Sequence, residues 1–429
     1  MFYSLLFTLA LLPDTDTLTL KQAVDMALAA SPEMRIVQAQ QAQAAQAIAD
    51  ARSAFIPSLY VGSGAAYTRG TLQFIEGQPP ALAQAYASGQ IFNMPLRYSI
   101  VESRAHSAAV GAGALSRRDD LIYRVATTYL DLDHTQHSLE LTRKETESLD
   151  KLLALTLERV KEGKEIPSEG TRARLNLAKN HQRLRELEGQ STLLEATLKS
   201  MLSLPEDRHI QTVTGSLPPS DDLKDMDSVA AENRAIARAW AESPELKRMA
   251  HEIEAKEAHV KSEQSQKLPQ MELVAQYGYF SQLTRFAVPL NNFTPNNVEL
   301  GTSLRIPLFA NRRIAARVGE ATAALTEARN EMEAAKRKIA LDVRQAFQAS
   351  RLAGASREVA GLELDLARET TGVVLAKFEE GRASARELEQ ARLEETARFN
   401  ALLDVGFDLD KARLQVLKTT GEIAAALER

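Results

Sequence analysis

One pair of residues in the sequence has the type and spacing of metal ligands. His134 and His137 are three positions apart, so both imidazoles would lie on one face of a helix. A zinc site needs at least a third ligand, and none follows at a matching spacing. The chain also contains no cysteine, which excludes thiolate ligands, disulfides and a catalytic thiol. We therefore interpret the pair as polar residues on a solvated helix face and expect no metal.

The sequence contains none of the usual catalytic motifs. It has no glycine-rich phosphate loop, no G-x-S-x-G motif and no convincing Ser/His/Asp order. Acidic and basic residues alternate along the chain, as is typical of exposed coiled-coil positions. The net charge of −5 argues against a nucleic-acid partner. We expect no enzymatic activity and no cofactor.

The two halves of the chain repeat one another. The tripeptide Ser-Pro-Glu at 31–33 recurs at 243–245, a shift of 212 residues (243 − 31). Gly163 recurs as Gly381 in a similar context, a shift of 218 (381 − 163). A repeat that holds its register over most of the chain predicts two structurally equivalent halves around a pseudo-symmetric axis.

Composition indicates long helices. Hydrophobic residues make up 44% of the 429 residues but aromatic residues only 5%, and a quarter of the chain is charged. This profile favours helices packed through small side chains over a compact aromatic core.

The first residues resemble a secretory signal peptide. Residues 1–12 form an apolar run that is followed by Pro13 and a polar stretch, and the run is too short to span a bilayer as a helix. We expect residues 1–17 to hold the signal peptide and the start of the mature chain. A buried N-terminal helix is the alternative.

The first helical stretch is predicted over 18–53. Thr19 can cap it, with Gln22 as the partner in a capping box. Pro32 interrupts the stretch, so Ser31 is expected to end one helix and cap the next.

Each half then contains two runs in which apolar residues alternate with polar or small ones. These runs cover 59–67 and 92–100 in the first half, and 271–279 and 298–306 in the second. Two such runs separated by a loop rich in glycine, proline or asparagine predict a β-hairpin. We place the hairpins at about 57–101 and 269–308.

The predicted strands fit a membrane barrel better than a soluble sheet. Each is about ten residues long, which suits a tilted strand that crosses a bilayer. A free hairpin is marginal in water, and four strands cannot close a barrel, so other chains must complete it. Three chains would supply twelve strands. Candidate aromatic residues for the two membrane interfaces are Tyr60, Tyr67, Tyr98, Tyr277, Tyr279 and Phe309.

A long helix and a returning helix follow each hairpin. The long helices are predicted over about 102–162 and 311–380, with narrow apolar stripes typical of coiled coils. The returning helices cover about 168–201 and 384–420, and a loop at 205–228 connects the halves. Strand positions align at a shift of 208 and helix positions at 218, which predicts a second long helix ten residues longer than the first.

Both long helices are predicted to end at a glycine. Gly163 and Gly381 suit the residue after a helix end, and Ser168 and Ser384 are the expected caps of the returning helices.

In this layout and in its tip motifs the chain resembles the TolC-like outer-membrane efflux proteins, also called outer membrane factors. The likeness covers nearly the whole chain after the signal peptide and includes the prolines Pro57 and Pro269 that precede the strands. The family's tip pattern is aromatic-x-x-Gly-x-x-Ser/Thr-x-x-Asp. The second tip matches it at Phe378, Gly381, Ser384 and Glu387, with Glu in place of Asp; the first tip matches at Gly163 and Glu169 but carries Val160 and Ile166 at the aromatic and hydroxyl positions.

The resemblance implies a mainly α-helical fold with a small membrane β part. Tandem-duplicated helical hairpins and two β-hairpins would complete, in a homotrimer, a twelve-stranded outer-membrane barrel and a helical tunnel through the periplasm. The tips would meet a periplasmic adaptor protein linked to an inner-membrane pump. Implied adaptor-contacting residues are Gly163, Ser168, Glu169, Phe378, Gly381 and Ser384; implied gate residues are Glu387, Gln390 and Arg386.

The function implied is that of a passive, gated outer-membrane channel in a tripartite efflux or type I secretion system. Opening would require the hairpin of the second half to realign, and Arg382 or Arg386 could offset repulsion between copies of Glu387. The two repeats would cover 18–228 and 229–429. The alternative is a periplasmic coiled-coil structural or adaptor protein without a channel.

Overall fold

The structure, a computed structural model, describes residues 16–63, 83–163, 165–213, 228–279, 296–380, 382–383 and 385–427. The chain divides into two compact units. The first, here called the sheet unit, comprises 38–114 and 245–335; the second, the hairpin unit, comprises 1–37, 115–244 and 336–429. Of the predicted signal-peptide region, only its last two residues are described, and they begin the strand β1.

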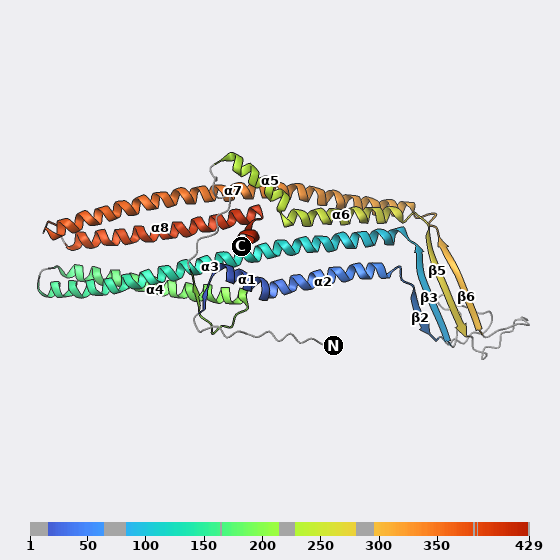
Figure 1. Ribbon diagram of the computed structural model, residues 1–429, viewed down its shortest axis with the longest axis horizontal. Helices are drawn as coiled ribbons and strands as arrows, with labels where there is room; N and C mark the ends of the chain where they lie inside the picture. Colours follow the sequence, from blue (N-terminus) through green and yellow to red (C-terminus); the bar gives the residue numbers. More distant parts are fainter. Residues whose placement is uncertain are drawn as a thin grey trace, which may run out of the picture. The chain divides into compact units, whose positions relative to one another are not determined.

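Four antiparallel strands form one sheet in the sheet unit (Figure 1). Their order is β2-β3-β5-β6, so the two predicted hairpins are confirmed and are joined through β3 and β5. The bounds are Ser58–Gly62 for β2, Ala83–Phe92 for β3, Gln270–Tyr279 for β5 and Asn296–Arg305 for β6.

The second strand of the first half lies earlier in the sequence than predicted. The alternating run at 92–100 belongs almost entirely to the helix α3 (Met94–Lys161), and the strand is β3 instead. Local capping explains the error. The side chain of Asn93 accepts a hydrogen bond from the backbone N–H of Leu96 at 3.1 Å, and Pro95 occupies the first helical turn, where it needs no N–H partner.

This correction also removes the predicted difference in helix length. The long helix of the second half, α7 (Asn311–Glu379), has 69 residues, and α3 has 68. The ten-residue difference was wrong because it came from aligning β6 with residues that are helical. Among the described residues, no helix is long and apolar enough to cross a bilayer.

Each long helix returns through a helical hairpin. The partner of α3 is α4 (Pro167–Leu202), and the partner of α7 is α8 (Ala385–Thr420). In the first hairpin the buried hydroxyl of Thr146 donates a hydrogen bond to Asn180 at 2.6 Å. In the second, the hydroxyl of Thr371 donates to the carbonyl oxygen of Ala391 at 3.2 Å.

The Ser-Pro-Glu tripeptides break the helices at equivalent places in the two halves. The first break separates α1 (Leu20–Ala30) from α2 (Pro32–Ser53), and the second separates α5 (Val229–Glu242) from α6 (Pro244–Ser265). The backbone N–H of Ser31 donates to Ala27, and that of Ser243 to Ala239, each at 3.0 Å. The predicted capping box of Thr19 and Gln22 is also present. The predicted break is therefore confirmed.

A small element that the sequence did not predict completes the core of the hairpin unit. Strand β1 (Asp16–Leu18) pairs in parallel with β4 (Ile210–Thr212), which lies in the stretch expected to be a loop. The short helix α9 (Ile423–Leu427) adds Ile423 and Leu427 to the core cluster, which also contains residues of α1, α3, α4 and α8.

Tyr129 of α3 holds this small sheet in place. Its ring is 2% exposed, its hydroxyl lies 2.6 Å from the carbonyl oxygen of Leu18, and it accepts a hydrogen bond from the N–H of Val213 at 2.9 Å. Burial raises the pKa of Tyr129 to about 12, so the hydroxyl stays protonated and able to donate.

Replacing Tyr129 with Phe should destabilise the hairpin unit. The change keeps the ring but removes the hydrogen bonds that the hydroxyl makes with the carbonyl oxygen of Leu18 and the N–H of Val213, at a cost of about 1 kcal/mol. Chemical denaturation of the detergent-purified protein, followed by circular dichroism, should show a lower midpoint. Tyr123→Phe is the control, because the hydroxyl of Tyr123 makes no hydrogen bond within the described residues. Equal midpoints for the two variants would contradict the role of Tyr129.

Candidate channel wall and gate

The two histidines of the H-x-x-H pair contact different groups. His134 contacts the carboxylate of Asp404 at 2.8 Å and packs against Phe407 with ring centroids 4.3 Å apart. His137 instead contacts the backbone oxygen of Asp133 at 3.0 Å on its own helix. No group of three potential metal ligands occurs in the part of the chain that the structure describes.

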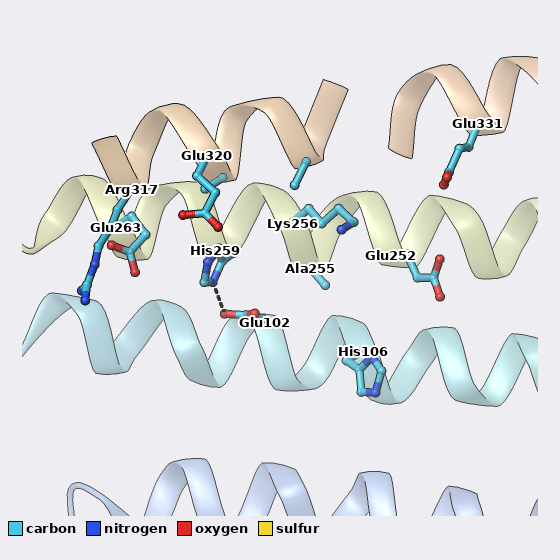
Figure 2. A pocket seen from close by; sticks show the side chains of 12 residues that line it. Glu102, His106, Glu252, Ala255, Lys256, His259, Glu263, Arg317, Glu320 and Glu331 are labelled. Carbon is cyan, nitrogen blue, oxygen red and sulfur yellow. Dashed lines mark hydrogen bonds and ion pairs between the residues drawn. The ribbon is translucent and has the colours of Figure 1, made fainter. Parts of the chain in front are cut away.

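An open cavity of about 720 Å³ lies in the sheet unit among α3, α6 and α7 (Figure 2). Its lining mixes charges of both signs, and His259 of α6 reaches Glu102 of α3 at 3.2 Å. Arg329 of α7 pairs with Glu257 of α6 at 2.6 Å nearby. These contacts tie the three helices together. We interpret it as a polar wall between helices.

The sheet has one apolar face and one polar face. Strand register places Val61, Ala85, Tyr277 and Val298 directly opposite one another on one face. The next row on the same face is Leu59, Ala87, Ala275 and Leu300. Val61, Val298 and Leu300 are each more than 70% exposed in the single chain. The opposite face carries Gln90, Glu272 and Ser303, and also Tyr60, Tyr86, Gln276 and Glu299.

This register corrects part of the predicted aromatic girdle. Tyr60 lies on the polar face, and Tyr98 lies in α3. Tyr277 and Tyr279 lie on the apolar face. Phe309 follows β6 and is 99% exposed. Tyr67 is outside the described residues.

The apolar stripe of α7 is largely exposed in the part of the chain that the structure describes. Here it is called the α7 stripe, and it consists of Leu352, Val359, Leu362, Leu366 and Val373. Each of these side chains is between 54% and 69% exposed. Their spacings of 7, 3, 4 and 7 are those of a coiled-coil seam.

The first tip connects α3 to α4 through Gly163. Its φ of +73° is strained for other residues, and its N–H donates to the oxygen of Val160 at 3.1 Å, as expected at a helix end. The predicted cap by Ser168 is wrong: Ile166 is the N-cap residue, and Pro167 starts the helix. A proline at this position has the required φ and lacks an N–H that would otherwise need a cap.

At the second tip, Phe378 ends the last turn of α7 and is 39% exposed. The N–H of Arg382 donates to the oxygen of Lys377 at 2.7 Å, and the side chain of Arg382 pairs with Glu380 at 3.2 Å. Gly381 and Ser384 lie outside the described residues.

Charged residues from both tips meet in a cluster, here called the tip cluster: Glu169, Arg172, Arg386 and Glu389. Glu169 accepts hydrogen bonds from Arg172 at 2.7 and 2.9 Å. Arg386, from the other tip, lies 3.6 Å from the same carboxylate. Burial, and then the negative charge of Glu169, raise the pKa of Glu389, while Arg172 opposes the shift. Glu169 is thus contacted by an arginine from each tip, and its negative charge acts on Glu389 of the second tip.

The sequence identified only part of this cluster. Arg386 and Glu169 were among the candidates, whereas Arg172 and Glu389 were not. Glu387 and Gln390 are exposed on α8. Glu389 could not be selected from the sequence because its environment depends on a residue 220 positions away (389 − 169).

The sequence matches the family model described as "Outer membrane efflux protein" over residues 23–203 and 235–422. The chain belongs to this family. The two matched segments fall in the two halves, which agrees with the tandem repeat. No protein of curated function matches the chain by sequence.

Solved structures have the same fold. The outer membrane protein VceC from Vibrio cholerae is 16% identical with a TM-score of 0.76, and the match covers 94% of this chain and 96% of that one. A membrane protein from Pseudomonas aeruginosa is 17% identical with a TM-score of 0.77, covering 94% and 93% of the two chains. The CmeC outer membrane channel of Campylobacter jejuni is 15% identical with a TM-score of 0.76, covering 94% and 85%.

Membership of this family identifies the protein as an efflux channel of the outer membrane and not an enzyme. The alternative of a coiled-coil scaffold without a channel is therefore wrong. An apolar face and a polar face are what a strand between lipid and a water-filled lumen requires.

Acidification should favour contact between the tips. Because the folded protein binds the proton of Glu389 more tightly than the unfolded chain does, stability gained at low pH is lost as the pH rises through the raised pKa. Conductance of the purified channel in planar bilayers should fall on acidification. Glu389→Gln, whose side chain is neutral at every pH, should show the low conductance at every pH tested.

Glu387→Gln is the matched control, because it removes a carboxylate two residues away that is exposed on the same helix. It should keep the pH response of the wild type. A Glu389→Gln channel that still responds to pH as the wild type does would show that another group is responsible.

Proposed function

We propose that three copies of the chain form one passive, gated conduit across the outer membrane and the periplasm. Twelve strands would close a barrel, and the long helical hairpins would continue it as a tunnel. A periplasmic adaptor would hold the tips and connect the conduit to an inner-membrane pump, which supplies the energy. The observation that carries this proposal is the sheet of this chain. It has one apolar and one polar face, and its edges are open to pairing among the described residues.

The edges of the sheet support a shared barrel. β2 and β6 are the outer strands of the sheet, so each has one row of backbone N–H and C=O groups without a strand partner among the described residues. Such groups cannot be left unpaired in lipid. Four strands are too few to close on themselves, whereas twelve suffice. Pairing of β6 with β2 of the next copy would satisfy both edges.

The α7 stripe supports the same assembly. Five apolar side chains at coiled-coil spacing, each more than half exposed, indicate a missing helical partner. A helix of a neighbouring copy would cover the stripe and seal the tunnel wall between protomers.

Negative charges introduced into the α7 stripe by substitution should weaken the trimer. Leu362→Asp together with Leu366→Asp would place carboxylates in the interface between copies, where they would lack partners. The wild type should be extracted from membranes only with detergent, at about three times the 47.2 kDa mass of the chain. The double variant should dissociate at a lower temperature in native mass measurements.

The control for this experiment is Arg368→Ala on the same helix. Arg368 is half exposed and lies about 160° around the helix from Leu366, away from the stripe, so its replacement should leave trimer dissociation unchanged. A monomer that is released without detergent would contradict the proposed assembly.

The tip cluster is the proposed latch of the closed state. Arg386 bridges from the second tip to Glu169 of the first, so it opposes separation of the two hairpins. Glu387 and Gln390, exposed on α8, remain candidates for the lining of the constriction. For the adaptor we propose contacts with Gly163, Ser168, Glu169, Phe378, Gly381 and Ser384.

Arg386→Glu should open the channel. The variant would place a third carboxylate beside Glu169 and Glu389, so that repulsion replaces attraction across the tips. Conductance in planar bilayers should rise several-fold, and the double variant Glu169→Arg with Arg386→Glu should restore the low value.

Arg392→Glu provides a control with the same change of charge on α8. Arg392 is exposed and has no ion-pair partner in the described part of the chain, so conductance should stay near that of the wild type. Equal increases for Arg386→Glu and Arg392→Glu would rule out a specific latch.

A further inference from the structure

The polar face of the sheet contains one row of residues unlike the others. Tyr60 of β2 pairs with Tyr86 of β3, Tyr86 with Gln276 of β5, and Gln276 with Glu299 of β6. These four side chains, here called the luminal row, lie side by side across all four strands. With strands about 4.8 Å apart, the row extends over about 14 Å.

The groups in the row are available to a ligand. Neither tyrosine ring packs against another ring, and Glu299 has no hydrogen bond or ion pair, within the described residues. Tyr60 is 65% exposed in the single chain. The row thus presents two aromatic rings, an amide and an uncompensated carboxylate on one surface.

This combination fits one class of ligand. Aromatic faces attract cations through their quadrupole and stack on planar rings, and a carboxylate adds charge complementarity. We propose that the luminal row is a wall site for aromatic organic cations, such as compounds that carry an ammonium or phosphonium group beside aromatic rings. The proposal rests on the proposed trimer, in which three copies of the row would line one lumen.

The neighbouring rows of the polar face lack this combination. One consists of Ser58, Ser88, Val274 and Gly301, with neither aromatic ring nor charge. Another contains Gln90, Glu272 and Ser303, which supply a carboxylate without an aromatic ring. Glu272 therefore serves as a matched control, because it has the same charge on the same face and also lacks a partner among the described residues.

Two ions of the same shape and opposite charge test the proposal. Tetraphenylphosphonium and tetraphenylborate would each be titrated calorimetrically into the detergent-purified trimer, with a micelle blank subtracted. The phosphonium ion should bind and the borate should not. Glu299→Gln, and separately Tyr60→Leu with Tyr86→Leu, should weaken phosphonium binding by about fivefold or more. Glu272→Gln should change it by less than about twofold.

Three outcomes would overturn the proposal: equal binding of the two ions, an unchanged affinity in Glu299→Gln, or the same loss in Glu272→Gln as in Glu299→Gln. The last would assign the effect to the net charge of the lumen and not to the row. Because Glu299→Gln preserves side-chain size, it remains informative even where the double tyrosine variant fails to assemble. Native mass, measured on the same samples, reports separately on the trimer, so failure of the assembly is distinguishable from failure of the site.

Discussion

The requirement that backbone polar groups be paired in lipid governs the whole structure. A bilayer offers no water to an N–H or C=O group, so each strand within it needs a partner on both sides. Within the described residues the chain supplies this for β3 and β5 but not for the edge strands β2 and β6. The sheet also has an apolar face that would be unfavourable in water. The proposed association of copies would therefore satisfy the backbone as much as the side chains.

The connections between sheet and helices are short and locally determined. At the entry to β2, Pro57 lies so close to Gly89 of β3 that a Cβ on the glycine would come within 3.0 Å of the proline ring. At the end of β3, Asn93 caps α3 only one residue after the strand ends. Strand and helix are thus joined with almost no intervening chain, which limits how far the register of one can change without the other.

The sheet and the tips use charge differently. In the sheet, polar and charged side chains stand on a fixed strand register, and Glu272 and Glu299 have no partners among the described residues. At the tips, Glu169 is contacted by Arg172 and by Arg386 of the other hairpin, while burial and the charge of Glu169 raise the pKa of Glu389. An arrangement held by a few partly exposed ion pairs is easily shifted, because such pairs are individually weak in water. A small free energy is accordingly enough to make or break the contact between the two tips.

The family, the tandem repeat, the helix break at Pro32 and the strands of the second half could be read from the sequence alone. Each of these depends on local chemistry or on a pattern that persists over many residues. The run at 92–100 was misassigned because apolar residues at alternate positions over a short stretch also occur at the start of a helix. Here Asn93, which caps the helix, and Pro95, in its first turn, favour the helix over a strand. Strands β1 and β4, with three residues each, are too short to show a period. The surroundings of Glu389 and the luminal row could be found only in the tertiary structure, because Glu389 lies 220 positions from Glu169 (389 − 169) and Tyr86 lies 190 positions from Gln276 (276 − 86).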